Sequence, residues 1–147
     1  MHEASEKDTV ALLQECGSGV RMGTESIRQV EDRIQSDAMR NQLTACREKH
    51  ERLARRTDAL LRKFDREPQQ PDPMARGMAW LKTNVKMMAD FSDSTAADVL
   101  TDGCNMGVKS LTKYLNEYSA AAPEARAITK ELIALEEQTV RELQPYL

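Results

Sequence analysis

Apolar residues in the first half of the chain recur at alternating spacings of three and four residues. This spacing is typical of a helix whose apolar side faces a partner helix along its whole length. It predicts one helix over 6–35 and a second over 37–66, each about 45 Å long. Because only one or two residues connect them, the two helices should pack antiparallel as a hairpin over 6–66. We call these apolar faces seams; their residues are Leu13, Cys16, Val20, Gly23, Ile27, Val30 and Ile34, then Met39, Leu43, Cys46, His50, Leu53, Thr57, Leu60 and Phe64.

Three prolines interrupt the helical pattern in the middle of the chain. Pro68, Pro71 and Pro73 lie within 67–73, which we interpret as a linker because proline lacks the amide hydrogen that a helix interior needs. Apolar residues then continue over 73–91. This segment is predicted to be a shorter crossover helix that is apolar over a broad arc.

The three-and-four spacing returns over 96–119 and 123–145, which predicts a second helical hairpin over 95–145. Ser5 and Thr95, each followed three residues later by Asp, are the predicted N-caps of the first helix of each hairpin. The sequence therefore predicts a single all-α domain that spans the whole chain. Its expected fold is an antiparallel four-helix bundle with a short extra helix in the crossover between two helical hairpins.

The composition narrows the classes of function. The 147 residues are 40% apolar and only 4% aromatic, which fits one helical domain, and the net charge of −3 argues against a nucleic-acid binder. No apolar run approaches the roughly 20 residues of a membrane span, and the polar N-terminus is unlike a signal peptide. The three cysteines show no paired spacing, so we interpret them as reduced thiols of a cytoplasmic protein, without a structural zinc.

One histidine occupies a seam position. When the first hairpin is paired about its turn, His50 falls opposite Gly23, and Cys46 falls opposite Ile27. Glycine leaves room for the imidazole and allows the two backbones to approach. One interpretation is a core histidine that is hydrogen-bonded internally; the other is a histidine that binds a metal or a small ligand at mid-bundle.

The helix predicted over 96–119 contains Gly103 and Gly107 near its middle, and each glycine costs about 1 kcal/mol there relative to alanine. These glycines either permit close packing or leave space for a ligand or a partner helix. Cys46 lies four residues before His50, but a buried seam does not favour a reactive thiolate. The candidate ligand-binding residues are His50, Gly23, Cys46 and Gly107; no catalytic residue, metal ligand set or cofactor is predicted.

Charged residues are concentrated on the helix predicted over 37–66, where Arg and Lys alternate with Glu and Asp. Pairs such as Glu48 with Arg52 are typical of a solvated helix face. Binding of an acidic partner is the alternative interpretation. Nucleic acid is not expected here, because no aromatic residues are interleaved with the basic ones.

The crossover segment carries more apolar surface than one buried stripe requires, and much of it is methionine. Flexible core filling is one interpretation, and an adaptable protein-binding or dimer face is the other. The candidate interface residues are Met74, Met78, Trp80, Met87 and Phe91.

Two long helical hairpins joined by a crossover resemble the ferritin-like superfamily. The layout over about 6–145 looks like small uncharacterised bacterial ferritin-like domains with a short helix around a tryptophan, here Met78-Ala79-Trp80-Leu81-Lys82. Metal-binding members use a Glu on the first and third core helices and Glu-x-x-His on the second and fourth. In this chain Arg47 stands three residues before His50, and the last helix has no histidine. The resemblance therefore implies the fold without the di-metal centre.

The missing catalytic set and the apolar face over 73–91 favour a non-catalytic bundle. It would act through self-association, as a homodimer, or through a protein partner, with no nucleic acid, membrane or cofactor. The first alternative is a sensor or carrier with a small-ligand or metal site around His50. The second is a ferritin-like metal-dependent oxidoreductase, for which the ligand set is missing.

Overall fold

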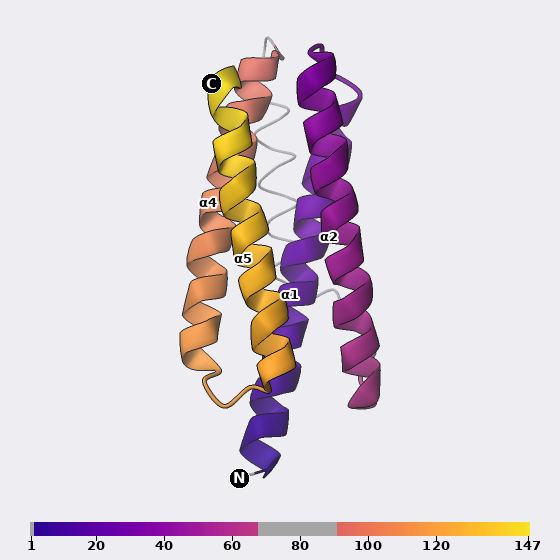
Figure 1. Cartoon of the computed structure of the whole chain (residues 1–147), viewed down its shortest axis with the longest axis vertical. Coiled ribbons are helices and arrows are strands. Elements are labelled where there is room, and N and C mark those ends of the chain that lie inside the picture. The colour runs from indigo at the N-terminus through magenta and orange to yellow at the C-terminus, as the bar shows by residue number, and fades with distance from the viewer. Residues whose placement is uncertain (1, 68–90) are drawn as a thin grey trace.

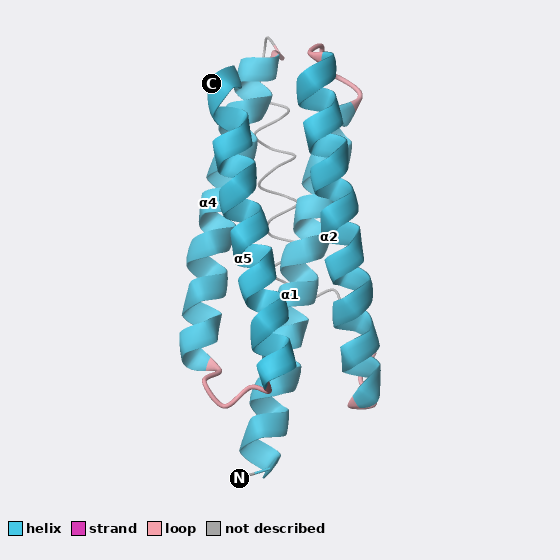
Figure 2. Cartoon of the chain, in the orientation of Figure 1, coloured by secondary structure: helices cyan, strands magenta, loops and turns pink. Residues whose placement is uncertain are grey.

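The computed structural model describes residues 2–67 and 91–147 (Figure 1). Helices account for nearly all of this part of the chain (Figure 2). The prediction of an all-α protein with four long helices is confirmed. The elements are α1 (His2–Glu31), α2 (Asp37–Lys63), α4 (Asp93–Glu117), α5 (Pro123–Leu143) and a closing 3-10 turn, η1 (Gln144–Tyr146).

The four helices stand side by side as two hairpins (Figure 1). In each hairpin, a short turn joins two helices that run in opposite directions, α1 with α2 and α4 with α5. The hairpins meet where α2 packs on α5 and where α1 packs on both α4 and α5. None of the helices in the described part of the chain is long and apolar enough to cross a membrane.

The hydrophobic core is formed by the predicted seams. All the seam residues of α2 are buried except Phe64, which packs partly buried against the core. On α5, Leu132 and Leu143 are almost fully enclosed. Burial of a leucine side chain stabilises the folded state by about 1.5–3 kcal/mol, so these seams hold the hairpins together.

The turn between α1 and α2 begins earlier than the periodicity predicts. The first helix was expected to reach residue 35, but α1 ends at Glu31, although Ile34 remains buried. The carboxylate of Asp93, at the start of α4, accepts hydrogen bonds from the backbone N–H groups of Gln35 and Ser36, at 2.8 and 2.9 Å. These bonds replace helical ones and allow the chain to reverse. They also fasten the second hairpin to the first.

Three other predicted helix ends were wrong. The chain is already helical from His2, so Ser5 is not the N-cap of α1. The N-cap of α4 is Ser92, which forms a capping box with Thr95 in place of the predicted box that starts at Thr95. At the far end of α2, the helix stops at Lys63 because Asp65 adopts a left-handed backbone conformation, with φ of 55°.

The last helix also ends slightly early. It was predicted to run to Pro145, but α5 stops at Leu143 and continues as the 3-10 turn η1. Proline has no N–H to donate, so the regular α-helical hydrogen-bond pattern ends here. The predicted linker over 67–73 and crossover helix over 73–91 fall almost wholly outside the described residues. Of the candidate interface residues, only Phe91 is described, and it lies outside α4.

Candidate functional site

A cavity of about 490 Å³ lies between the helices of the bundle and opens onto the surface, since its lining includes Met106, which is 55% exposed. Its volume falls in the range of about 300–1,000 Å³ that is typical of small-molecule sites. Most of the lining residues come from α1 and α4, and α2 and α5 contribute the remainder. The polar members of the lining are few and include Ser18, Ser26, His50 and Glu136.

Glycines keep this cavity open. Gly19 and Gly23 of α1, and Gly103 and Gly107 of α4, all line it. A methyl group added at Gly103 would meet no atom of the described residues within 4 Å, so the described chain leaves open space in front of that backbone. At Gly107 an added Cβ would lie 3.6 Å from the Glu136 carboxylate, which is an ordinary van der Waals contact.

Gly23 has a different role, since it makes room for a histidine. An added Cβ at Gly23 would lie 2.8 Å from both Cδ2 and Nε2 of His50. The expected facing of His50 and Gly23 is therefore what the structure contains. The imidazole ring of His50 is 2% exposed and fills the space that the missing side chain leaves.

Both ring nitrogens of His50 are hydrogen-bonded. Nδ1 lies 2.8 Å from the carbonyl oxygen of Cys46, which can only accept, so Nδ1 carries a hydrogen. Nε2 lies 2.8 Å from Oε1 of Glu136, which reaches across from α5. Glu136 is itself 7% exposed, so His50 and Glu136 form a buried pair that joins the two hairpins.

The imidazole of His50 is protonated at neutral pH, because its pKa is raised to about 10. Burial by itself lowers the pKa of His50, but the hydrogen bonds to Cys46 and Glu136, together with the Glu136 charge, raise the pKa to about 10. Nε2 therefore donates to the carboxylate from a protonated ring. With both nitrogens engaged, the imidazole has no free lone pair to accept a proton from a substrate, which disfavours a role as general base.

Two cysteines, Cys46 and Cys104, line the cavity, and Cys46 donates a hydrogen bond. Thr139 donates its only hydroxyl hydrogen to the carbonyl of Leu135, so the contact of 3.1 Å between Cys46 Sγ and Thr139 Oγ1 requires the thiol to donate. Cys104 lines the cavity beside Glu136, and burial, followed by the Glu136 charge, raises the pKa of its thiol. Cys104 is therefore disfavoured as a nucleophile, because attack requires the thiolate.

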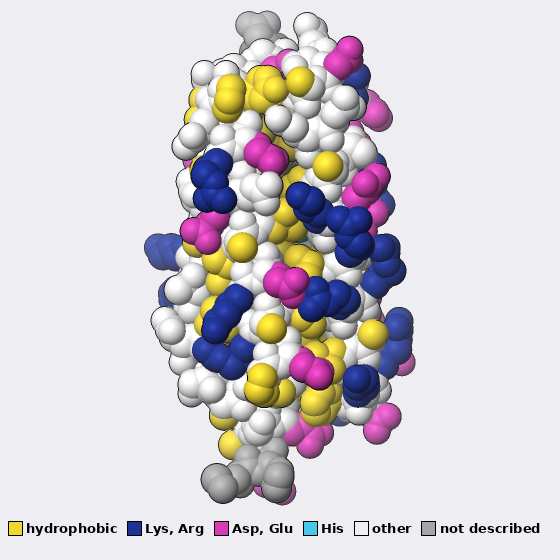
Figure 3. Space-filling model, in the orientation of Figure 1, with side chains coloured by type: hydrophobic (Ala, Val, Ile, Leu, Met, Phe, Trp, Pro, Cys, Tyr) yellow, Lys and Arg dark blue, Asp and Glu magenta, His cyan; other side chains and the backbone are white. Residues whose placement is uncertain are grey.

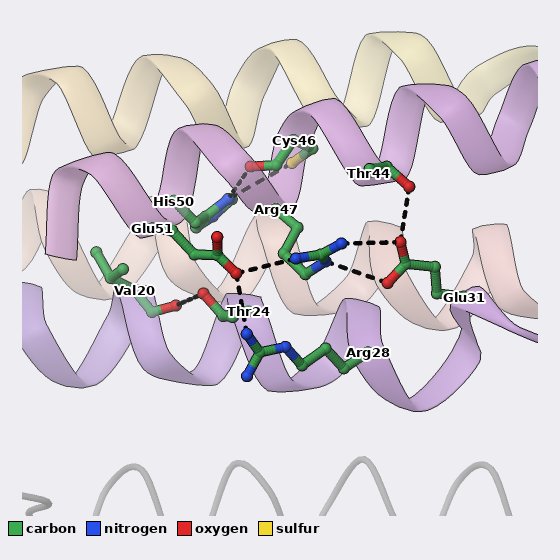
Figure 4. A network of polar contacts seen from close by, with 9 residues as sticks. All are labelled: Val20, Thr24, Arg28, Glu31, Thr44, Cys46, Arg47, His50 and Glu51. Atoms are coloured by element: carbon green, nitrogen blue, oxygen red, sulfur yellow. Dashed lines mark hydrogen bonds and ion pairs between the residues drawn. The ribbon is translucent and has the colours of Figure 1, made fainter.

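An ion-pair network on the surface of the first hairpin flanks the histidine (Figure 4). Arg47 binds Glu31 of α1 through Nε and Nη2, and binds Glu51 through Nη1 at 3.0 Å. Glu31 also accepts from Thr44, and Glu51 accepts from Arg28. The network ties α1 to α2 on the outside at the level where His50 ties α2 to α5 on the inside.

We compared the chain with known protein families, characterised proteins and solved structures. None of them matches. The fold and the site therefore have to be interpreted from their own chemistry.

The structure brings all four candidate ligand-binding residues to one cavity. His50, Gly23, Cys46 and Gly107 each line it, although ligand binding itself stays a prediction. Among the described residues, no group of three or more His, Cys, Asp and Glu side chains is arranged to hold a metal ion.

The sequence interpretation did not single out several polar residues of the cavity, among them Glu136 and Ser18. Glu136 lies four residues after Leu132 and three before Thr139, a spacing that places it on the buried face of α5. Ser18 carries no comparable signal, because a serine in a helix does not indicate what faces it.

The basic character of α2 belongs to its outer surface. Figure 3 shows Lys and Arg side chains mixed with Asp and Glu on this face of the bundle. Arg56 of α2, for example, pairs with Glu131 of α5 at 2.8 Å while both are about half exposed. Such pairs are typical of a solvated face and contribute little to stability.

Proposed function

We propose that this protein binds a small, largely apolar molecule in its central cavity and acts as a carrier or sensor for that molecule. The observation that carries the proposal is a cavity of about 490 Å³ whose lining includes glycines of α1 and α4. The hydrogen-bonded pair of His50 and Glu136 forms part of its wall. Open apolar space in a core forfeits packing energy, and four mid-helix glycines add a further cost of about 1 kcal/mol each. Binding of a ligand would offset both costs.

The polar groups support binding more than catalysis. His50 has both nitrogens engaged, and Cys46 donates its hydrogen to Thr139. An active site needs a group that is free to exchange a proton or attack a substrate. None of these side chains is free in that way.

Blocking the cavity tests the proposal. A Cβ at Gly103 would meet no atom of the described residues within 4 Å, so Gly103→Leu should place its side chain in the cavity, and leucine favours helix over glycine. The probe is the uncharged, polarity-sensitive dye Prodan, whose binding is followed by fluorescence titration. Asn105→Leu is the matched control, because this exposed position of α4 adds the same side chain outside the cavity lining.

We expect saturable binding of one Prodan per chain, at least a tenfold loss of affinity in Gly103→Leu, and no change in Asn105→Leu. Absence of saturable binding to the unaltered protein would overturn the proposal. Equal affinity of the Gly103→Leu protein would place the dye elsewhere and also count against it. Native mass spectrometry of freshly purified protein shows directly whether a small molecule co-purifies.

Action through self-association or a protein partner stays a prediction. The face that suggested it comprises Met74, Met78, Trp80, Met87 and Phe91, and the structure describes only the last of these. The ring of Phe91 lies 4.0 Å under the guanidinium of Arg33 and packs partly buried against the core, so much of it is covered within the chain itself. The same mass measurement reads the number of subunits.

The ferritin-like layout is our proposal for how the hairpins are connected. In Figure 1, α2 ends at the opposite end of the bundle from the start of α4. The intervening chain has to join these two ends, as a ferritin-like crossover does. This supports the layout and carries no implication of metal chemistry.

A further inference from the structure

The hydroxyl of Ser18 is a buried group of the cavity lining that has no partner among the described residues. Ser18 is 4% exposed and lines the cavity, and its Oγ has no hydrogen-bond partner in the structure as described. Two other hydroxyl residues of α1 behave differently, since Thr24 donates to Val20 and Ser26 donates to Met22. An unsatisfied buried hydroxyl costs about 1–3 kcal/mol, which a ligand with a hydrogen-bonding group would recover.

The charges around the cavity disfavour an anion. The positive charge of His50 is already neutralised by Glu136. The remaining ionisable carboxyl of the lining is Glu15, whose pKa is raised by burial and by the nearby Glu117, against a hydrogen bond from Tyr114. A carboxylate ligand would therefore lose its hydration next to two acidic side chains and gain no free cation among the described residues of the lining.

A cation is not favoured either. The carboxylate of Glu136 is bonded to the imidazole of His50 at 2.8 Å, and burial raises the pKa of Glu15, which disfavours its charged form. An ammonium group would have to break the pair of His50 and Glu136 or ionise Glu15 to be compensated within a mostly apolar wall. An uncharged ligand meets none of these costs.

We infer that the ligand is an uncharged, mainly apolar molecule with one hydrogen-bonding oxygen, such as an alcohol, a phenol or a ketone, that binds the Ser18 hydroxyl. This inference rests on the proposed function and specifies the chemical class of its ligand. Ser18 is then the positioning residue for the polar end of the ligand. The glycine-lined space receives the apolar body.

Four probes that share one ring system but differ in charge and in hydrogen-bonding group test the inference. The probes are naphthalene, 2-naphthol, 2-naphthoate and 2-naphthylmethylammonium, titrated by isothermal calorimetry at neutral pH. We expect 2-naphthol to bind about 3- to 10-fold more tightly than naphthalene, which is the contribution of one net hydrogen bond. The two charged probes should each bind at least tenfold more weakly than 2-naphthol.

Ser18→Ala should remove the preference for 2-naphthol and leave naphthalene binding unchanged. Ser26→Ala is the matched control, because Ser26 also lines the cavity but its hydroxyl is already bonded to Met22. Alanine favours helix at both positions, so both variants should fold.

The outcomes separate this inference from the proposed function. If naphthalene binds and Gly103→Leu blocks it, the cavity is a ligand site, whatever the substituents do. Equal affinities for naphthalene and 2-naphthol, or a preference that survives Ser18→Ala, would overturn the role of Ser18. Tightest binding of 2-naphthoate or of the ammonium would overturn the uncharged class. If no probe binds, the proposed function falls and this inference falls with it.

Discussion

Alanine at position 23 tests whether the imidazole of His50 is held rigidly against α1. A Cβ at this position would lie 2.8 Å from two ring atoms, closer than real Cβ atoms approach their neighbours. The ring has no easy escape, because Nδ1 is bonded to the Cys46 carbonyl and Nε2 is bonded to Glu136. Gly23→Ala therefore has to displace either the helix or the ion pair.

Two effects of opposite sign set the magnitude. Removal of a mid-helix glycine stabilises the folded state by about 1 kcal/mol. Overpacking a core costs about 1–3 kcal/mol, and complete loss of a buried ion pair costs about 3–5 kcal/mol. Because a small displacement weakens the pair of His50 and Glu136 without removing it, we expect a net loss of about 1–3 kcal/mol in the free energy of unfolding.

Urea unfolding followed by circular dichroism measures this change. Gly103→Ala is the matched control on α4: its Cβ meets no atom of the described residues within 4 Å, so it should gain about 1 kcal/mol. In a background where His50 and Glu136 are both alanine, the ring is gone and no charge is left unpaired. Gly23→Ala should then be stabilising. The reasoning is refuted if Gly23→Ala is as stable as the unaltered protein, or if it is equally destabilising without the ring.

Three further predictions concern the charges and thiols around the site. The pKa of His50 is raised to about 10, so its contribution to stability is complete below about pH 6.5 and is lost as the pH rises through 10. Between about pH 6.5 and 8.5, the free energy of unfolding should decline by up to about 1.4 kcal/mol per pH unit. Glu136→Gln should abolish this decline, and an unchanged slope in that variant would contradict the pairing of His50 with Glu136. All three cysteines are buried, so a thiol reagent should label none of them quickly in the folded protein and all three in urea; rapid labelling without denaturant would show an accessible thiol. Arg47→Ala should lower the free energy of unfolding by about 1 kcal/mol, since it removes bonds to two glutamates. Arg56→Ala, which breaks one exposed pair, should change it by less than about 0.5 kcal/mol. Equal effects of the two variants would contradict the distinction between the network and an exposed pair.

The spacing of apolar residues predicts the buried faces of the helices but not where the helices end. The buried faces of α1 and α2 follow from spacing alone, because the intrinsic helical repeat fixes which side chains share a face. The end of α1 does not, because it depends on Asp93, a residue far along the chain that accepts hydrogen bonds from Gln35 and Ser36. The left-handed turn at Asp65 is similar, since the usual glycine signal is missing there.

The candidate site likewise contains one contact that the sequence predicts and one that it does not. Sequence alone was sufficient to place His50 opposite Gly23, because a short turn fixes the register of two helices in one hairpin. It could not pair His50 with Glu136, which lies 86 residues away in the other hairpin. That contact depends on the rotation and height of one hairpin relative to the other.

What the sequence by itself determined is therefore local: four amphipathic helices, their buried faces, and the fit of a histidine against a glycine. The tertiary structure decided the partner of the histidine, the cavity between the helices and the unpartnered hydroxyl of Ser18. The physical reason is that helical periodicity specifies which face is buried, whereas packing between hairpins specifies what that face meets.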